Sequence, residues 1–260
     1  MNKKPILVLI TALVLILGLV VGSVYFSPQT TARRKLAKQR LRFNDQKIFS
    51  QAVLTGDDRL VKLFLEAGAV KPDISWSSWQ IIQDNPKTLS RKTTKIVGPI
   101  LLDAALRGHV KVVRLLLDYG AEIDGANNLG LTALIEASTV GEVEVIKLLI
   151  FRGAKVDKAE NTGLTALMLA ASQGKVAVVE VLLKNQAQIN LQDQTGSTAL
   201  IHATREGELK VVRQLLQYRA DVTLKDKLGL TALDWAKLLQ YKEIENILKK
   251  VRAADKRALV

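Results

Sequence analysis

The residues that could do acid–base, nucleophilic or metal chemistry are few in this chain of 260 residues. There is no cysteine, which excludes disulfides, thiol nucleophiles and cysteine-ligated zinc. The only histidines, His109 and His202, do not form a paired-histidine metal motif, and the chain has no nucleophile elbow and no phosphate-binding loop. Asp and Glu are scattered along it. We therefore expect no enzyme, and no metal, cofactor or small-molecule substrate.

The net charge of +13 is distributed unevenly. Residues 1–47 hold nine Lys or Arg and one Asp, whereas residues 98–260 hold 22 basic and 19 acidic residues. The basic excess therefore lies beside the hydrophobic N-terminal segment, where an anionic membrane surface explains it better than a phosphate backbone does. This location predicts a membrane association and no nucleic-acid partner.

The segment 6–26 is apolar throughout and carries no charge. A helix of that length spans about 30 Å, which matches the hydrocarbon core of a bilayer. A cleaved signal peptide is the alternative. Its apolar core would be shorter, at about 7–15 residues, and Gly22, Ser23 and Val24 form no clean cleavage site. We expect an uncleaved transmembrane signal anchor over residues 1–27.

Orientation depends on the basic residues that flank this segment. Six lie between Arg33 and Arg42, so the positive-inside rule favours a cytoplasmic repeat domain. A short tail with Lys3 and Lys4 is often retained inside, which would instead place the rest of the chain in the periplasm or another extracytoplasmic space. Residues 31–49 predict a helix, which is either a membrane-surface helix or a connector packed on the first repeat.

Three series of residues recur at intervals of 33. Four pentapeptides of the form Gly-x-Thr-Ala-Leu begin at Gly130, Gly163, Gly196 and Gly229. A second series consists of Gly108, Gly141, Gly174 and Gly207. A third, in which Ala follows each residue, is Gly120, Gly153, Gln186 and Arg219. A fixed period of this length indicates stacked structural repeats.

Each residue type suits one position in a pair of helices. Thr132 and its equivalents precede an apolar run, where a hydroxyl can accept a hydrogen bond from an unpaired amide. The second series of glycines suits the left-handed position after the first helix. Apolar runs such as residues 112–117 and 178–183 then place aliphatic rows on one side of a second helix.

At these residues the sequence resembles the ankyrin-repeat family. The family signature Thr-Pro-Leu-His-x-Ala-Ala is matched by the hexapeptide or heptapeptide stretches that begin at Thr132, Thr165 and Thr198. The signature histidine is replaced by Ile135, Met168 and Ile201, so we expect its hydrogen bond to the threonine to be missing. The Asp of the family's turn matches Asp193 and Asp226, and is replaced by Asn127 and Glu160. The resemblance implies an all-α solenoid of helix-turn-helix units with projecting β-turns.

The domain plan follows from the repeat. We expect a basic juxtamembrane helix or linker over 28–47 and an ankyrin-repeat domain over 48–260. Its units are a cap at 48–70, four repeats at 97–129, 130–162, 163–195 and 196–228, and a cap at 229–260. The step from Gly56 to Gly108 is 52 residues, which is 19 more than one period of 33. The excess predicts an insertion at 71–96. Trp76 and Trp79 in this insertion either contact a partner or cover the end of the first repeat.

The function predicted from this resemblance is a membrane-tethered scaffold for protein–protein interaction, and the alternative is an exported structural or protective module. In ankyrin proteins the β-turn tips and the first helices, which face a concave groove, carry recognition. The candidate partner-binding residues at those positions are Asn128, Leu129, Leu131, Glu136, Thr139, Asn161, Thr162, Leu164, Leu169, Ser172, Gln194, Thr195, Ser197, His202, Arg205, Lys227, Leu228, Leu230 and Trp235. The five leucines at the tips are expected to form an apolar line. The identity of the protein partner does not follow from the sequence.

Overall fold

The computed structural model describes residues 28–39, 41–42, 46–68, 75–77 and 97–258. The chain forms two compact units, Met1–Pro72 and Asp73–Val260. The membrane anchor predicted at residues 6–26 lies outside the described residues, so it stays a prediction. Within the described ranges, no helix is both long enough and apolar enough to span a bilayer.

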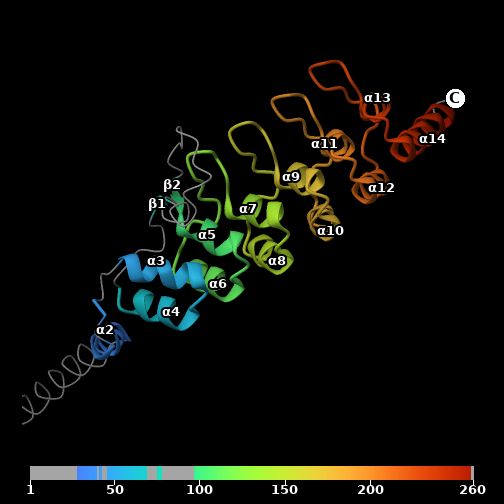
Figure 1. Cartoon of the computed structure of the whole chain (residues 1–260). Coiled ribbons are helices and arrows are strands. Elements are labelled where there is room, and N and C mark those ends of the chain that lie inside the picture. Colours follow the sequence, from blue (N-terminus) through green and yellow to red (C-terminus); the bar gives the residue numbers. More distant parts are fainter. Residues whose placement is uncertain (1–27, 40, 43–45, 69–74, 78–96, 259–260) are drawn as a thin grey trace, which may run out of the picture. The chain divides into compact units, whose positions relative to one another are not determined.

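The first unit contains three described helices, α2 (Pro28–Lys38), α3 (Gln46–Thr55) and α4 (Asp58–Glu66) (Figure 1). The pair α3 and α4 is held by Phe49 and Phe64, which are fully buried with ring centroids 5.9 Å apart and the rings tilted by 60°. Burying one such side chain stabilises the fold by about 1.5–3 kcal/mol. Helix α2 packs against α4, with Ala32 and Leu36 in the core.

The expectation of one helix over residues 31–49 is wrong. The helix α2 ends at Lys38, where the backbone N–H groups of Gln39 and Leu41 turn back onto the carbonyls of Lys35 and Leu36. Its apolar face is occupied by α4, and the Nε of Arg33 donates to the carbonyl of Ala67 at 3.0 Å. This segment is therefore a connector packed on the first helix pair, and not a helix with a free face for a membrane surface.

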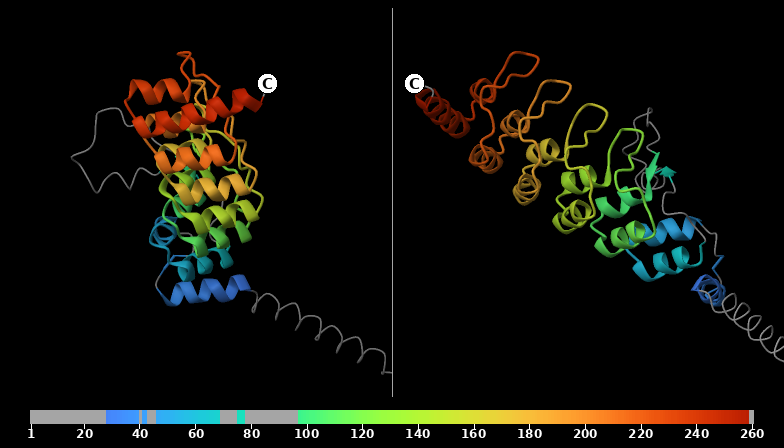
Figure 2. Two further views of the ribbon diagram at one scale, coloured as in Figure 1. Left: turned by 90° about the vertical axis from the view of Figure 1, so that its right-hand side faces the viewer. Right: turned by 180° about the vertical axis from the view of Figure 1, so that it is seen from behind.

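The described residues of the second unit form a stack of five helix pairs (Figures 1 and 2). The first helices are α5 (Ile100–Leu106), α7 (Ala133–Val140), α9 (Ala166–Ser172), α11 (Ala199–Arg205) and α13 (Ala232–Leu238). The second helices are α6 (Val110–Asp118), α8 (Val143–Phe151), α10 (Val176–Lys184), α12 (Leu209–Gln217) and α14 (Lys242–Ala258). Each helix contacts its equivalent in the next pair, so first and second helices form two rows.

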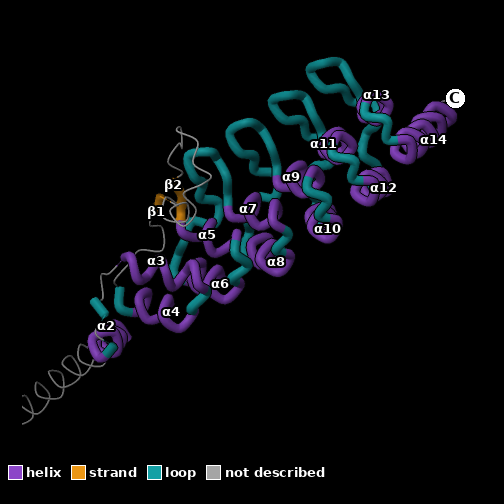
Figure 3. Tube along the Cα trace, in the orientation of Figure 1, coloured by secondary structure: helices purple, strands orange, loops and turns teal. Residues whose placement is uncertain are grey.

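Long loops project from the row of first helices, as the loop colouring of Figure 3 shows. We call the loop ends around Gly130, Gly163, Gly196 and Gly229 the tips, and the surface made by the tips and the first helices the inner face. The base of three of these loops is closed by backbone bridges, which pair Ala126 with Thr132, Ala159 with Thr165 and Lys225 with Thr231. The tips at Gly130, Gly163 and Gly229 are thus hairpins held directly before a first helix.

The expected helix signals are confirmed. Thr132, Thr165, Thr198 and Thr231 each cap a first helix by accepting the backbone N–H three residues later. Gly141 adopts a left-handed conformation with φ of 105° where its helix ends. Ile135, Met168 and Ile201, which replace the family's histidine, are at most 2% exposed and belong to the core. Aliphatic packing thus takes the place of a polar bridge there.

The insertion adds two short strands to this helical fold. Strand β1 (Ser75–Ser77) pairs antiparallel with β2 (Val97–Pro99), which places Trp76 opposite Gly98 in the ladder. The pairing brings Ser77 beside Val97, and Pro99 then caps α5 without a side-chain hydrogen bond. Trp79 lies outside the described residues, as does the side chain of Trp76, so both readings of these tryptophans stay open.

Candidate protein-binding face

A polar side chain at the base of each tip fixes the turn. The acceptors are Asn127, Glu160, Asp193 and Asp226, and each accepts the backbone N–H groups two and four residues later. At Asp193 these distances are 2.8 Å from Thr195 and 2.9 Å from Ser197. Hydrogen bonds to a carboxylate are stronger than those between neutral groups, so the tips are held rigidly.

Successive tips are also bonded to one another. The backbone N–H groups of Asn161, Gln194 and Lys227 donate to carbonyls of the preceding tip at 2.8–3.0 Å. Two side chains repeat this connection, because Asn161 donates to the carbonyl of Asn128 at 3.0 Å and Gln194 to that of Asn161 at 2.8 Å. The amide groups of Asn161 and Gln194, predicted as partner contacts, thus already join neighbouring tips.

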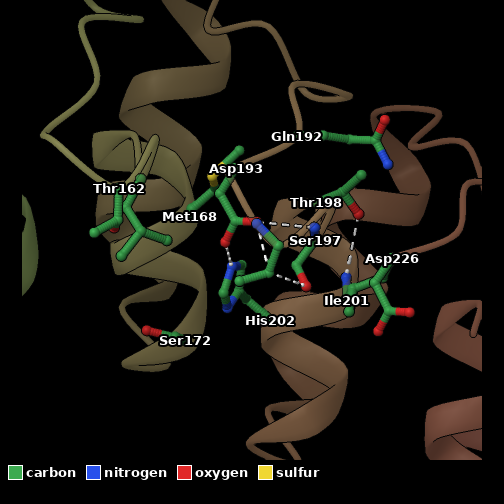
Figure 4. Close-up of polar contacts among 12 residues, drawn as sticks. Thr162, Met168, Ser172, Gln192, Asp193, Ser197, Thr198, Ile201, His202 and Asp226 are labelled. Carbon is green, nitrogen blue, oxygen red and sulfur yellow. Dashed lines mark hydrogen bonds and ion pairs between the residues drawn. The ribbon is translucent and has the colours of Figure 1, made fainter. Parts of the chain in front are cut away.

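The second oxygen of two of these carboxylates reaches the inner row of helices. Asp193 Oδ2 lies 2.8 Å from His202 Nε2, as Figure 4 shows, and the indole Nε1 of Trp235 donates to Asp226 Oδ2 at 2.6 Å. Burial acts to raise the pKa of Asp193, but hydrogen bonds from Thr195, His202 and the backbone outweigh it, so that the pKa is lowered. Neither bond was expected from the sequence, which predicted His202 and Trp235 only as partner contacts.

One position of each first helix forms a row along the inner face. Its members are spaced by 33 residues and are half-buried: Asp103, Glu136, Leu169, His202 and Trp235. Burial raises the pKa of Asp103, against the attraction of Arg107, and burial together with the negative charge of Asp103 raises that of Glu136. The row is therefore acidic at its beginning and carries an imidazole and an indole at its end. Asp103 was missed because no tip glycine precedes its repeat.

A hollow of about 360 Å³ lies at the later end of the inner face, between the tips at Gly196 and Gly229. We call it the tip hollow, and its lining residues are Gln194, Thr195, Ser197, Arg205, Asp226, Lys227, Leu228 and Trp235. The guanidinium carbon of Arg205 lies 4.7 Å from the centre of the Trp235 ring, a cation–π contact. Seven of its eight lining residues were predicted partner contacts, and Asp226 is the addition.

The other predicted residues differ in their accessibility. Leu228 is 74% and Leu129 38% exposed, whereas Leu131, Leu164 and Leu230 are half-buried, so the apolar line of the tips is interrupted. Ser197 is 1% exposed, which leaves little of it for a partner. Three hydroxyls bond within their own repeat, because Thr139 and Ser172 donate to their own helices and Thr162 to Glu160. Asn128, Thr195 and Lys227 are exposed.

The described residues contain no group of three or more His, Cys, Asp or Glu that could hold a metal ion.

The chain matches the family model described as ankyrin repeats (3 copies) over residues 49–160, 101–193 and 167–258. These stretches together cover most of the chain, so the protein belongs to the ankyrin-repeat family. A search of the curated proteins finds no match. Ankyrin repeats are interaction modules whose stacked units present extended binding surfaces.

Proposed function

We propose that this protein is a membrane-tethered scaffold that binds a partner protein through the inner face of its second unit. The observation that carries the proposal is the contrast between two sets of repeated positions. Positions that build the scaffold keep the same chemistry from repeat to repeat, such as the capping threonines Thr132, Thr165, Thr198 and Thr231. The row along the inner face changes instead from repeat to repeat. Its members Asp103, Glu136, Leu169, His202 and Trp235 are two acids, an aliphatic residue, an imidazole and an indole.

His202 and Trp235 also bond to tip carboxylates within the fold, but the change from two acids to an aliphatic residue in the earlier repeats serves no such bond among the described residues. The half-buried side chains of the row are held in place on rigid helices, and the tips beside them are fixed by hydrogen bonds. Pre-organised groups lose little conformational entropy when a partner binds, which favours affinity. The inner face therefore supplies a fixed array of different chemical groups, as a specific protein-binding surface requires.

Site-specific photo-crosslinking in the source cell tests which face binds. A photoreactive residue is placed at Leu129 or Leu228 on the tips, and at Phe151 or Lys210 on the second helices as matched exposed controls. We expect a covalent adduct of one defined mass from the tip positions and none from the controls. Adducts only from the second helices would show that another face binds.

The membrane tether is supported by the apolar, uncharged segment 6–26 and by the basic residues that follow it. We expect the full chain to stay in the membrane fraction after high-salt or carbonate washing, because salt screens electrostatic attraction but does not release a spanning helix. A mature chain that begins near residue 27 would identify the segment as a cleaved signal peptide. Release of an uncleaved chain by the wash would contradict a spanning anchor.

The basic cluster after the segment supports a cytoplasmic repeat domain under the positive-inside rule. A reporter enzyme that is active only outside the cytosol, fused after Val260, is therefore expected to be inactive. Activity would place the repeats in the periplasm or another extracytoplasmic space, and would favour the exported module. The partner would then have to be sought in that space.

A further inference from the structure

The tip hollow combines a cationic rim with one buried carboxylate. Arg205 and Lys227 are exposed, and no carboxylate of the described residues forms an ion pair with either of them. The one carboxylate in the lining, Asp226, is buried and already accepts from Leu228, Leu230 and Trp235. The charge that the hollow presents to solvent is therefore positive.

The lining also has an apolar part, formed by Leu228 and Trp235. Leu228 is 74% exposed at the tip, above the half-buried ring of Trp235. On the same helix as Trp235, Leu238 follows three residues later and is 63% exposed. Residues three apart are neighbours on a helix surface, so these side chains extend one apolar surface beside the cationic rim.

The position of Arg205 is fixed by its own contact. Its guanidinium carbon lies over the ring of Trp235, whose indole N–H is in turn bonded to Asp226. A guanidinium held in this way keeps its N–H donors in a fixed fork, which matches the two oxygens of a carboxylate. Tryptophan and arginine are also the residues that most often dominate binding energy at protein interfaces.

We infer that the tip hollow binds a segment of the partner protein in which an aspartate or glutamate stands next to a bulky aliphatic or aromatic residue. The carboxylate pairs with Arg205 and Lys227, and the apolar side chain packs against Leu228 and Trp235. This inference rests on the proposed function, since it names the chemistry of the partner at that face. It goes further by placing the specificity in the last two repeats.

A nucleic acid fits the same hollow less well. A polyanion lying along the inner face would meet Asp103 and Glu136 at the other end of the row. Single-stranded nucleic acids also stack successive bases on several aromatic rings. Here the described lining has one ring, Trp235, and Arg205 already covers a face of it. A peptide needs only one local carboxylate and one apolar group.

The test uses the purified full chain and a displayed library of random decapeptides. We expect selection to enrich peptides with Asp or Glu adjacent to Leu, Phe, Tyr or Trp. Binding of the best peptide is then measured by fluorescence polarisation against Arg205→Glu and Leu228→Asp, two changes of exposed side chains that leave the core intact. Each should weaken binding by about tenfold or more, as expected for groups at the centre of a binding site.

Two matched variants serve as controls. Lys210→Glu makes a comparable charge reversal on α12, and Phe151→Asp removes a comparably exposed apolar group at the end of α8. Both should leave the affinity within about twofold, since surface changes away from a site have small effects. Raising the salt concentration should weaken the wild-type complex, because an exposed ion pair is screened.

Several outcomes would overturn the inference. They are selection of basic or uncharged peptides, the absence of any enriched peptide, and tighter binding of an oligothymidylate probe than of the peptides. Wild-type affinity for the best peptide in both Arg205→Glu and Leu228→Asp would also overturn it. If the tip crosslinks still form in such a case, the inner face binds its partner by another chemistry. If the crosslinking experiment gives no adduct from the tip positions, that result counts against the proposed function itself.

Discussion

Asp193 and His202 are joined by a 2.8 Å contact between Oδ2 and Nε2, which ties the base of a tip to the first helix of its own repeat. The same relationship recurs 33 residues later, where Trp235 donates to Asp226 at 2.6 Å. In both pairs the partners are nine residues apart. The two earlier repeats have Glu136 and Leu169 in place of the donor, so this tie is confined to the later end of the stack.

Replacing Asp193 tests how much the tie and the turn contribute. Asp193→Ala removes the acceptor for the N–H groups of Thr195 and Ser197, and a buried unsatisfied donor costs about 1–3 kcal/mol. We expect a loss of about 2–4 kcal/mol in the free energy of unfolding, measured by urea denaturation at pH 7. Asp193→Asn should cost about 1 kcal/mol, since Asn127 already holds an equivalent turn through an amide oxygen. Equal losses in both variants would contradict this account.

The lowered pKa of Asp193 gives a pH dependence of known sign. The folded state favours the carboxylate, so its contribution is fully present above the ordinary pKa of about 4. It is lost as the pH falls through the lower folded pKa. Wild type should therefore lose its advantage over Asp193→Asn when the unfolding free energy is followed from pH 6 into acid. A difference that does not change with pH would show that the charge of Asp193 does not matter.

Glu136 gives the opposite pH dependence. Burial, and then the negative charge of Asp103, raise its pKa, so the folded state disfavours the ionised form. Between the ordinary and the raised pKa the folded state holds more protons, and its stability falls as the pH rises. Glu136→Gln should therefore raise the urea midpoint at pH 7 and leave it unchanged near pH 3. Glu206→Gln, at an exposed position, is the control and should have little effect at either pH.

The features that the sequence could predict are those that depend on residues three or four positions apart. Thr132 caps its helix and Gly141 ends it through bonds to residues three or four positions away. The contact of Asp193 with His202 was not predictable in this way, because it requires the loop to fold back over the helix that follows. The packing of α2, with its buried Leu36, on α4 was only one of two alternatives, since basic residues surround a narrow apolar face. The tip hollow depends on two neighbouring repeats and on the stacking of Arg205 over Trp235.

Three described residues other than glycine, Gln186, Arg219 and Gln240, occupy a left-handed conformation that suits glycine. Gln186 and Arg219 have φ of 64° and 62° at the position where earlier repeats have Gly120 and Gly153. A side chain in this conformation costs about 1–2 kcal/mol, and the greater freedom of glycine in the unfolded state offsets part of the gain. Gln186→Gly should thus stabilise the protein by about 0.5–1 kcal/mol in urea denaturation.

The reverse change is the matched control for this prediction. A Cβ added at Gly153 would meet no atom within 4 Å, so Gly153→Gln tests the backbone conformation without a clash. It should destabilise the protein by about 1 kcal/mol. If Gln186→Gly lowers the urea midpoint while Gly153→Gln raises it, the left-handed strain does not control stability at these turns.

The tip glycines separate backbone strain from close packing. Gly163 and Gly229 have φ of 87° and 76°, so alanine is strained at both. A Cβ on Gly163 would lie 3.0 Å from the backbone nitrogen of Gln194 and 3.1 Å from Cα of Asp193, whereas one on Gly229 would meet nothing within 4 Å. The difference arises because a further tip is stacked on Gly163 and none is stacked on Gly229 within the described residues.

We therefore expect Gly229→Ala to cost about 1 kcal/mol, the strain alone. Gly163→Ala should cost about 2–4 kcal/mol, because the backbone of the next tip must move and its bonds to the preceding tip weaken. Urea denaturation measures both losses. Hydrogen exchange should also show faster exchange of the Gln194 amide, which donates to the carbonyl of Thr162, in Gly163→Ala but not in Gly229→Ala. Equal destabilisation by both variants, with unchanged exchange at Gln194, would mean that contact between the tips does not stabilise the stack.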